Sequence, residues 1–358
     1  MARAITQAAV AIAANTERQG KSRYRVFVGI LVVALVVAIV ASLGVGAVVV
    51  PARKIALTLL GRDSLARDQR IILISIRLPR ILAAALVGSS LSVSGLLFQG
   101  LFRNPLADPY VVGSSGGAVL GASLGVFLLP SVSIAGFGAT ALLAFVGAVC
   151  SIMLVYALAH VNGRTPVVAL LLAGFAVSTM LSYSSYFLEV LDHDFGSGLR
   201  VLTSWLHGTI SQPSWGQLAT VTAMLVFGLA GSVPLARRLN TLALGEEYAT
   251  HLGVQVQQTR VAIIVIGSLL TAAAVALGGL ISFVGLVVPH IMRMMLGPDH
   301  TRLLPVTALA GAVFLILADT VARIIIAPAE LSVGVLTAFI GGPFFLYLLR
   351  NTKQELLL

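Results

Sequence analysis

Two short glycine-containing segments carry residue types that could perform chemistry. Gly113-Ser114-Ser115-Gly116-Gly117 matches G-x-S-x-G, the pattern with which hydrolases expose a nucleophilic serine between a strand and a helix. Gly20-Lys21-Ser22 has the last residues of a phosphate-binding loop, but Asn15 stands where that motif needs its first glycine. Because no strand-like sequence precedes either segment, we predict that this chain has no catalytic residue and no ATP site.

Metal ligation is also disfavoured by the spacing of the candidate ligands. The six histidines form no H-E-x-x-H pair, and most fall at the ends of hydrophobic segments or in predicted loops. Cys150 is the one cysteine, and it lies within an apolar run, so neither a disulfide framework nor a thiolate site is indicated. We therefore predict no metal ligands and no cofactor bound by this chain itself.

Asp319 and Arg323 are charged residues within an otherwise apolar segment. A lone carboxylate at the centre of a membrane would be unfavourable by about 2.5 to 3.5 kcal/mol on insertion scales. The two residues are four positions apart, one helical turn, so their side chains can pair. We interpret them as a structural ion pair near the outer interface, with a proton relay as the alternative.

The composition places these residues in a lipid bilayer. Of the 358 residues, 58% are hydrophobic and 10% are charged, and the mean hydropathy is +1.02. Crossing about 30 Å of hydrocarbon takes roughly 20 apolar residues in a helix, and segments of that length recur along the chain. Runs such as 32–40 are apolar at every position, which favours helices over the alternating strands of a barrel.

The predicted fold is an all-α integral membrane protein with about ten transmembrane helices and with both termini in the cytoplasm. Residues 1–25 are expected to form a cytoplasmic leader, 26–349 a single transmembrane domain and 350–358 a cytoplasmic tail. An even number of spans and the distribution of Lys and Arg support this orientation. The predicted spans are 26–50, 81–101, 111–129, 134–159, 167–190, 218–235, 261–277, 280–295, 304–321 and 331–349.

Basic residues give two further signals. The formal charge is +10, but the cations lie at span ends without interleaved aromatic residues, so a nucleic-acid partner is not predicted. The predicted outer loop from Arg53 to Arg80 holds seven Lys and Arg residues, against the positive-inside tendency. We expect a functional reason for that concentration; a solvated loop in which Asp63 and Asp68 offset part of the charge is the alternative.

Small residues and one long loop complete the pattern. Gly113, Gly117, Gly121 and Gly125 recur every four residues, which favours close helix packing and leaves lining of a path for a bulky solute as the alternative.

The predicted inner loop 236–260 has two short helical stretches around a glycine, which would make a compact knob. A plain solvated connector is the other interpretation.

Several ordered motifs, running from about residue 70 to the end, resemble one family. They are Arg77-Leu78-Pro79-Arg80, 99–109, 242–253, 283–290, 317–323, 330–337 and 341–345. Together they are similar to the permease subunits of binding-protein-dependent ABC importers for iron-siderophores, haem and cobalamin, which are type II importers. The resemblance implies a homodimer in the inner membrane with two ATP-binding cassette subunits, which hold ATP and Mg²⁺, and a soluble substrate-binding protein.

The resemblance also implies roles for individual residues. Arg77, Arg80 and Arg323 are expected at the outer face, where they would dock acidic side chains of the binding protein. The expected coupling loop, which would sit in a cleft on the ATPase, comprises Gly245, Glu246, Glu247, Ala249 and Gly253. In the fifth helix, Ser182 and Tyr183 are candidate weak contacts along the path.

We expect the cargo to be an iron chelate, either a siderophore complex or haem. Cobalamin is the alternative within the same family. A secondary transporter driven by ions is a further alternative, but it would need buried ionisable residues, and Asp319 beside Arg323 is nearly the only candidate.

Overall fold

A computed structural model describes residues 2–46, 51, 53–54, 57, 67–134, 136–161, 165–191, 197–210, 212–327 and 329–356. The end of the first predicted span (47–50) and most of the basic loop between 52 and 66 lie outside the described residues.

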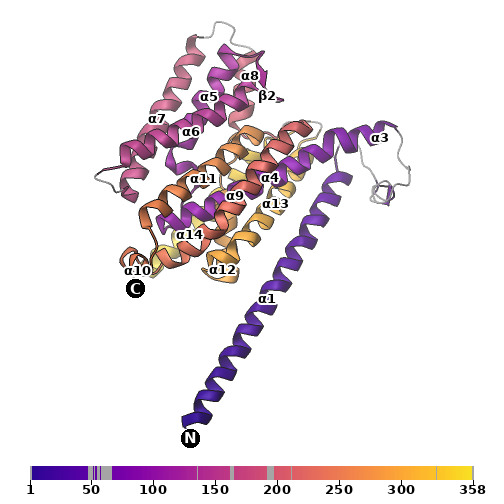
Figure 1. Cartoon of the computed structure of the whole chain (residues 1–358). Coiled ribbons are helices and arrows are strands. Elements are labelled where there is room, and N and C mark those ends of the chain that lie inside the picture. Colours follow the sequence, from indigo (N-terminus) through magenta and orange to yellow (C-terminus); the bar gives the residue numbers. More distant parts are fainter. Residues whose placement is uncertain are drawn as a thin grey trace.

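Helices make up almost all of the described structure (Figure 1). One hairpin of two short strands, β1 (Ser133–Ile134) and β2 (Phe137–Gly138), pairs antiparallel. The helices in the first half are α1 (Ala2–Gly44), α3 (Arg67–Ile71), the π-helix η1 (Ile72–Arg77), α4 (Leu78–Phe102), the 3₁₀ helix η2 (Pro109–Val112), α5 (Ser114–Leu128), α6 (Ala139–Ala159) and α7 (Val167–Leu191). Those in the second half are α8 (Ser197–Leu206), α9 (Trp215–Leu242), α10 (Glu246–His251), α11 (Val256–Gly278), α12 (Val284–Leu296), α13 (His300–Ile324) and α14 (Val333–Leu356).

Seven of the described helical segments are long and apolar enough to cross a membrane. They are Ser22–Gly44, Asp68–Phe102, Ala139–Ala159, Val167–Leu191, Trp215–Leu242, Val256–Gly278 and His300–Ile324. Three shorter apolar helices, Ser114–Leu128, Val284–Leu296 and Val333–Leu348, fall at the remaining predicted spans. The positions of all ten predicted segments are thus occupied by apolar helices, while the number that cross the bilayer stays a prediction.

Two predicted boundaries differ from the observed helices. α1 is continuous from Ala2, so no break separates the expected leader from the first span. α9 continues to Leu242 and α11 begins at Val256, so the connection between them is shorter than the predicted loop 236–260. α9 continues because Ala236, Leu239 and Leu242 are buried against the bundle, which stabilises the helix beyond the apolar run itself.

α4 is the central helix of the bundle and packs against α9, α11, α12 and α13. It has buried residues around its whole circumference, which is typical of a helix enclosed by other helices. Its serines satisfy neighbouring carbonyl groups: Ser89 donates to Ala308 O over 2.8 Å and Ser94 to Gly267 O over 2.7 Å. Such interhelical hydrogen bonds help hold helices together where lipid provides no hydrophobic drive.

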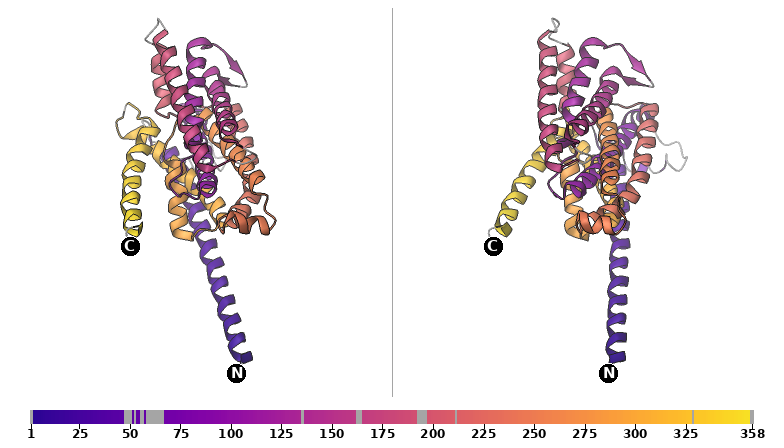
Figure 2. Two further views of the ribbon diagram at one scale, coloured as in Figure 1. Left: turned by 90° about the vertical axis from the view of Figure 1, so that its left-hand side faces the viewer. Right: turned by 60° about the vertical axis from the view of Figure 1, so that its left-hand side comes forward.

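The two terminal helices contact the bundle along only part of their length. α1 packs against α13, and its N-terminal part projects away from the other helices (Figure 1). α14 stands apart from the main group of helices in both views of Figure 2. Its large side chains Phe339 and Leu346 are 74% and 66% exposed. These two helices therefore leave apolar surface for lipid or for a partner.

Candidate functional site

A buried charged network lies where α3, η1 and α4 join into one continuous helical segment. Arg77 ends the π-helix η1, and Arg80 lies in the first turn of α4. Arg80 Nε is 3.0 Å from Asp319 Oδ1, and its Nη1 is 2.7 Å from Glu330 Oε2. Arg323 Nε lies 3.1 Å from Asp319 Oδ2 as an ion pair, not as a directed hydrogen bond. One carboxylate that is 1% exposed thus neutralises charge from two helices.

The same network fastens the end of α1. Arg77 Nη1 donates to Leu43 O over 2.7 Å, and Arg323 Nη2 donates to Ser42 Oγ over 2.6 Å. The Ser42 hydroxyl oxygen also accepts a 2.8 Å hydrogen bond from Thr320 Oγ1. Three segments far apart in the sequence are therefore tied together by arginine side chains.

These contacts bear on two predictions. The Asp319–Arg323 ion pair is confirmed. Arg77 and Arg80 are among the residues expected to face a binding protein, yet they are only 6% and 8% exposed and already contact groups of their own chain. Docking by these arginines therefore stays a prediction. A carboxylate of the binding protein would have to reach guanidinium groups that already contact Leu43 O and Asp319.

Sequence reasoning missed two members of the network. Glu330 lies in a motif that supports the family resemblance, but its spacing from Arg80 gives no local signal of a pair. Ser42 lies in the first hydrophobic segment, where a serine is unremarkable by sequence. Both are more than 200 positions from their arginine partners, at separations of 250 and 281 residues, so only the tertiary fold brings them together.

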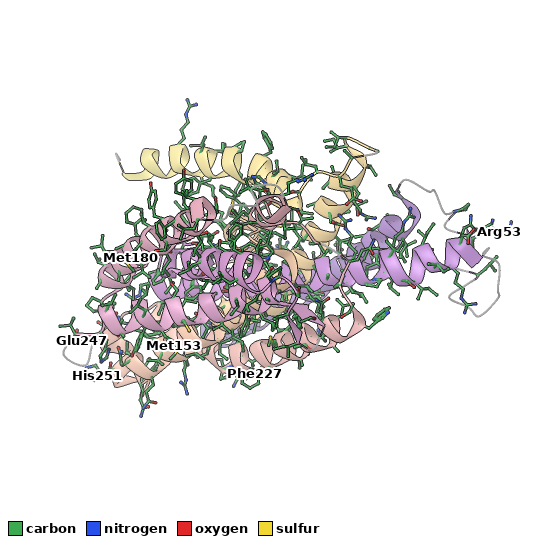
Figure 3. All side chains as sticks on the ribbon, turned by 90° about the horizontal axis from the view of Figure 1, so that it is seen from above. Arg53, Met153, Met180, Phe227, Glu247 and His251 are labelled. Atoms are coloured by element: carbon green, nitrogen blue, oxygen red, sulfur yellow. The ribbon has the colours of Figure 1, made fainter. Side chains whose placement is uncertain are left out.

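A second polar site is built around α10, a helix of six residues. Gly245 and Gly253 flank it with φ angles of +122° and +82°, a backbone region that favours glycine. Ala249 is the fully buried residue of α10, and Glu246 forms an ion pair with Arg260 of α11. Figure 3 shows Glu247 and His251 at one end of the molecule and Arg53 at the opposite end.

Three large apolar side chains are exposed in and beside α10. Leu244, Tyr248 and Leu252 are 67%, 68% and 66% exposed, and all three lie within the short connection between α9 and α11. Exposed apolar groups gathered in one place often mark a site of protein interaction. The sequence predicted two short helical stretches around a glycine in this loop, and the structure has one, α10.

A cavity of about 470 Å³ lies between η2, α12 and α14. Its polar lining groups include Asp108, Tyr110 and Ser282, and Phe283 and Phe345 contribute aromatic surface. Asp108 Oδ1 accepts a 2.9 Å hydrogen bond from the backbone N–H of Tyr110, so this carboxylate caps η2. Ser182 and Tyr183 are on the exposed side of α7 and are not among the residues that line this cavity.

The predicted glycine stripe lies between α5 and α6. A Cβ atom on Gly117 would come 2.1 Å from Gly147 O, and one on Gly121 would come 1.9 Å from Leu143 O. A Cβ on Gly125 would come 2.5 Å from Thr140 N. Gly113 differs, because it precedes α5 with a φ of +94° and so serves the turn from η2. The last three glycines therefore permit close packing of two helices.

Known transport proteins resemble this chain in sequence and in fold. A family model described as the FecCD transport family matches residues 34–351. The cobalamin import system permease protein BtuC of Halobacterium salinarum is 46% identical over 288 residues, covering 80% of this chain and 76% of the relative. The hemin transport system permease protein HmuU of Yersinia pestis is 37% identical over 344 residues, covering 94% and 98%. A solved inward-facing metal-chelate type ABC transporter has a TM-score of 0.78 and 31% identity, covering 91% of this chain and 99% of that one.

An apolar helical bundle with polar sites at its two ends defines a multi-pass permease of the inner membrane. The chain belongs to the FecCD transport family, so the resemblance inferred from its motifs is confirmed. Its role is that of a transport subunit. Among the described residues, no three His, Cys, Asp or Glu side chains are grouped as metal ligands would be.

Proposed function

We propose that this chain is the permease subunit of an ABC importer that carries an iron chelate, either a siderophore complex or haem, across the inner membrane. The observation that carries the proposal is the family match over residues 34–351, joined by a metal-chelate type transporter of the same fold. ATP hydrolysis takes place on a partner subunit. The permease supplies the path and the contacts that couple it to the partners.

Cobalamin is the second candidate cargo. The relative that is named as a cobalamin import permease shares 46% identity, compared with 37% for the relative named for hemin. Both cargoes are large rings or chelates around a metal, so one wide apolar path suits either of them. The soluble binding protein, not this chain, would choose between them.

The partners are a second copy of this chain, two ATP-binding cassette subunits and a substrate-binding protein. Leu244, Tyr248 and Leu252 around α10 support an ATPase contact, because their exposed apolar surface would be buried there. The exposed aromatic residues Tyr183 of α7 and Phe339 of α14 support a second copy, since they would otherwise meet only lipid.

Docking of the binding protein is proposed at Arg77, Arg80 and Arg323. Glu330 suggests how docking would proceed, because its side chain is 52% exposed while its carboxylate pairs with Arg80. A carboxylate from the binding protein would replace Glu330 at Arg80 Nη1, while Arg80 Nε would keep its contact with Asp319. In this proposal, Glu330 of the permease competes with the binding protein's carboxylate for Arg80.

Glu330→Gln tests this exchange. Loss of the competing charge should tighten binding of the substrate-binding protein to the assembled importer, mainly through a faster on-rate. Surface plasmon resonance with the complex in nanodiscs would measure the affinity and both rate constants. Weaker binding by the variant would show that Glu330 is itself a docking residue and would contradict exchange.

Transport itself is tested in proteoliposomes that contain the permease and its ATPase. Uptake of radiolabelled haem, ferric siderophore and cobalamin is compared with and without the binding protein and internal ATP. We expect uptake of one iron chelate only when all components are present. Uptake under an ion gradient with neither ATPase nor binding protein would overturn the importer and favour a secondary transporter.

A further inference from the structure

A groove of about 650 Å³ runs between α9 and α13, apart from the cavity and the two polar ends. Each helix contributes five residues to its lining. They are Leu229, Ala230, Val233, Ala236 and Arg237 on α9, and Thr301, Leu304, Pro305, Ala308 and Leu309 on α13. Small side chains leave the space open, since three of the ten residues are alanines. Apart from Arg237 and Thr301 the lining is entirely apolar.

The two polar lining residues lie at the same end of the groove. Arg237 is five residues before the end of α9, and Thr301 is the second residue of α13, so both are at the α10 end of the bundle. From Arg237 to Leu229 the helical rise is about 12 Å. One leaflet of a bilayer has a hydrocarbon thickness of about 15 Å, half of the roughly 30 Å core. The groove therefore has the depth of a single acyl layer.

Arg237 provides a positive charge at the mouth of the groove. Its side chain is exposed, and none of the ion pairs among the described residues involves it. The nearby carboxylate of Asp299 is already used, because it pairs with Arg302 and accepts a 2.6 Å hydrogen bond from Thr301 Oγ1. The Arg237 guanidinium at the mouth of the apolar groove matches an anionic lipid, because it can bind the charged headgroup while the groove holds an acyl chain.

We propose that this groove binds an anionic phospholipid, with the phosphate at Arg237 and one acyl chain between α9 and α13. Basic pockets between transmembrane helices on the cytoplasmic side bind anionic headgroups in other membrane proteins. The leaflet assignment rests on the proposed function, because it requires the α10 end to face the ATPase. Binding itself follows from the groove and its charge.

Native mass spectrometry of the complete importer tests the site with phosphatidylglycerol and phosphatidylcholine as probes. We expect phosphatidylglycerol to be retained preferentially and Arg237→Ala to weaken its binding about fivefold, which corresponds to about 1 kcal/mol for one basic residue at the membrane surface. Arg238→Ala is the matched control, since Arg238 is an exposed neighbour outside the groove and should leave retention unchanged.

A larger side chain in the groove tests the proposed binding of the acyl chain. Ala230→Leu adds bulk at an exposed lining position and should lower retention with Arg237 intact, whereas Ala223→Leu, at an exposed position on α9 outside the groove, should not. Equal retention of both lipids, or equal effects of Arg237→Ala and Arg238→Ala, would overturn the proposal. Uptake is not the readout, so failure of this site and failure of the importer function are distinguishable.

Discussion

Asp319 is the residue on which the buried charged network depends, since Arg80 and Arg323 both lie within 3.1 Å of its carboxylate. A buried charge without a partner is far less favourable than a buried pair. Removing this one carboxylate would leave the Arg323 guanidinium without its carboxylate and Arg80 with Glu330 alone, whereas removing Glu330 would leave Asp319 paired with both arginines.

We predict that Asp319→Asn destabilises the protein by about 3 to 5 kcal/mol, the range for breaking a buried ion pair. Glu330→Gln is the control within the same network, and it should change stability by at most about 1 kcal/mol because its side chain is 52% exposed. Chemical unfolding in detergent, followed by intrinsic fluorescence, measures both. If the two variants were equally stable, the network would contribute little to the fold.

The same network shows what sequence could and could not predict at the residue scale. Asp319 and Arg323 are one helical turn apart, so their pairing follows from helix geometry alone. Arg80 is 239 positions from Asp319, and no local rule connects them. The docking role assigned to the arginines came from family resemblance, which carries no information on whether the guanidinium groups are already paired.

At the scale of elements, the contact between α5 and α6 depends on backbone approach. The Cβ that would be added at Gly121 would lie 1.9 Å from a carbonyl oxygen, a distance that no packing adjustment of a side chain can relieve. The two helices would have to separate. Glycine is a poor helix former in isolation, so its presence here reflects packing and not propensity.

Gly121→Ala should therefore destabilise the protein, by about 1 to 3 kcal/mol as in other overpacked contacts. Gly29→Ala is the matched control: Gly29 lies within α1, and a Cβ added there would meet nothing within 4 Å. That change should be neutral or stabilising, because alanine favours helix. Thermal melting of both variants in the same detergent provides the measurement. If Gly121→Ala were as stable as Gly29→Ala, close packing at Gly121 would contribute nothing to stability.

α10 is the second element that makes a specific prediction. Leu252→Asp removes an exposed apolar side chain that we expect the ATPase to bury, which is a loss of about 1.5 to 3 kcal/mol, or roughly 10-fold to 150-fold in affinity. Leu128→Asp is the control, since Leu128 is 62% exposed at the end of α5. Co-purification with the ATPase should fail for the first variant and persist for the second. Loss in both would point to general misfolding.

The positions of the helices were predictable, because apolar runs of about 20 residues are a strong signal. The ends of the helices were not predictable from these runs. α9 extends past its apolar run into Arg237 and Arg238, whose charged side chains are exposed while the opposite side of the helix stays buried. Gly245 and Gly253, both named in the predicted coupling loop, flank α10, but the formation of a single helix between them depends on the burial of Ala249, a residue of α10 itself.

At the scale of the whole molecule, α7 and α14 present aromatic side chains that this chain does not cover. Phe175, Tyr183 and Phe339 are 74%, 72% and 74% exposed. Lipid could cover them, as it covers the exposed valines of α1. A second copy related by two-fold symmetry would instead bury the same surface on both subunits. The sequence could not separate these cases, because lipid-facing and subunit-facing residues are equally apolar.

Cross-linking of single introduced cysteines distinguishes a surface that faces lipid from one that faces a second copy of the chain. In a Cys150→Ser background, Tyr183→Cys and Phe339→Cys should give covalent dimers with a bis-maleimide reagent in native membranes, because both positions would lie at the shared interface. Val33→Cys, at a site on α1 that is 62% exposed, should stay monomeric because it faces lipid. Denaturing electrophoresis measures the dimer fraction. Dimers from Val33→Cys alone would place the interface on α1, and dimers from none of the three would argue against pairing through α7 and α14.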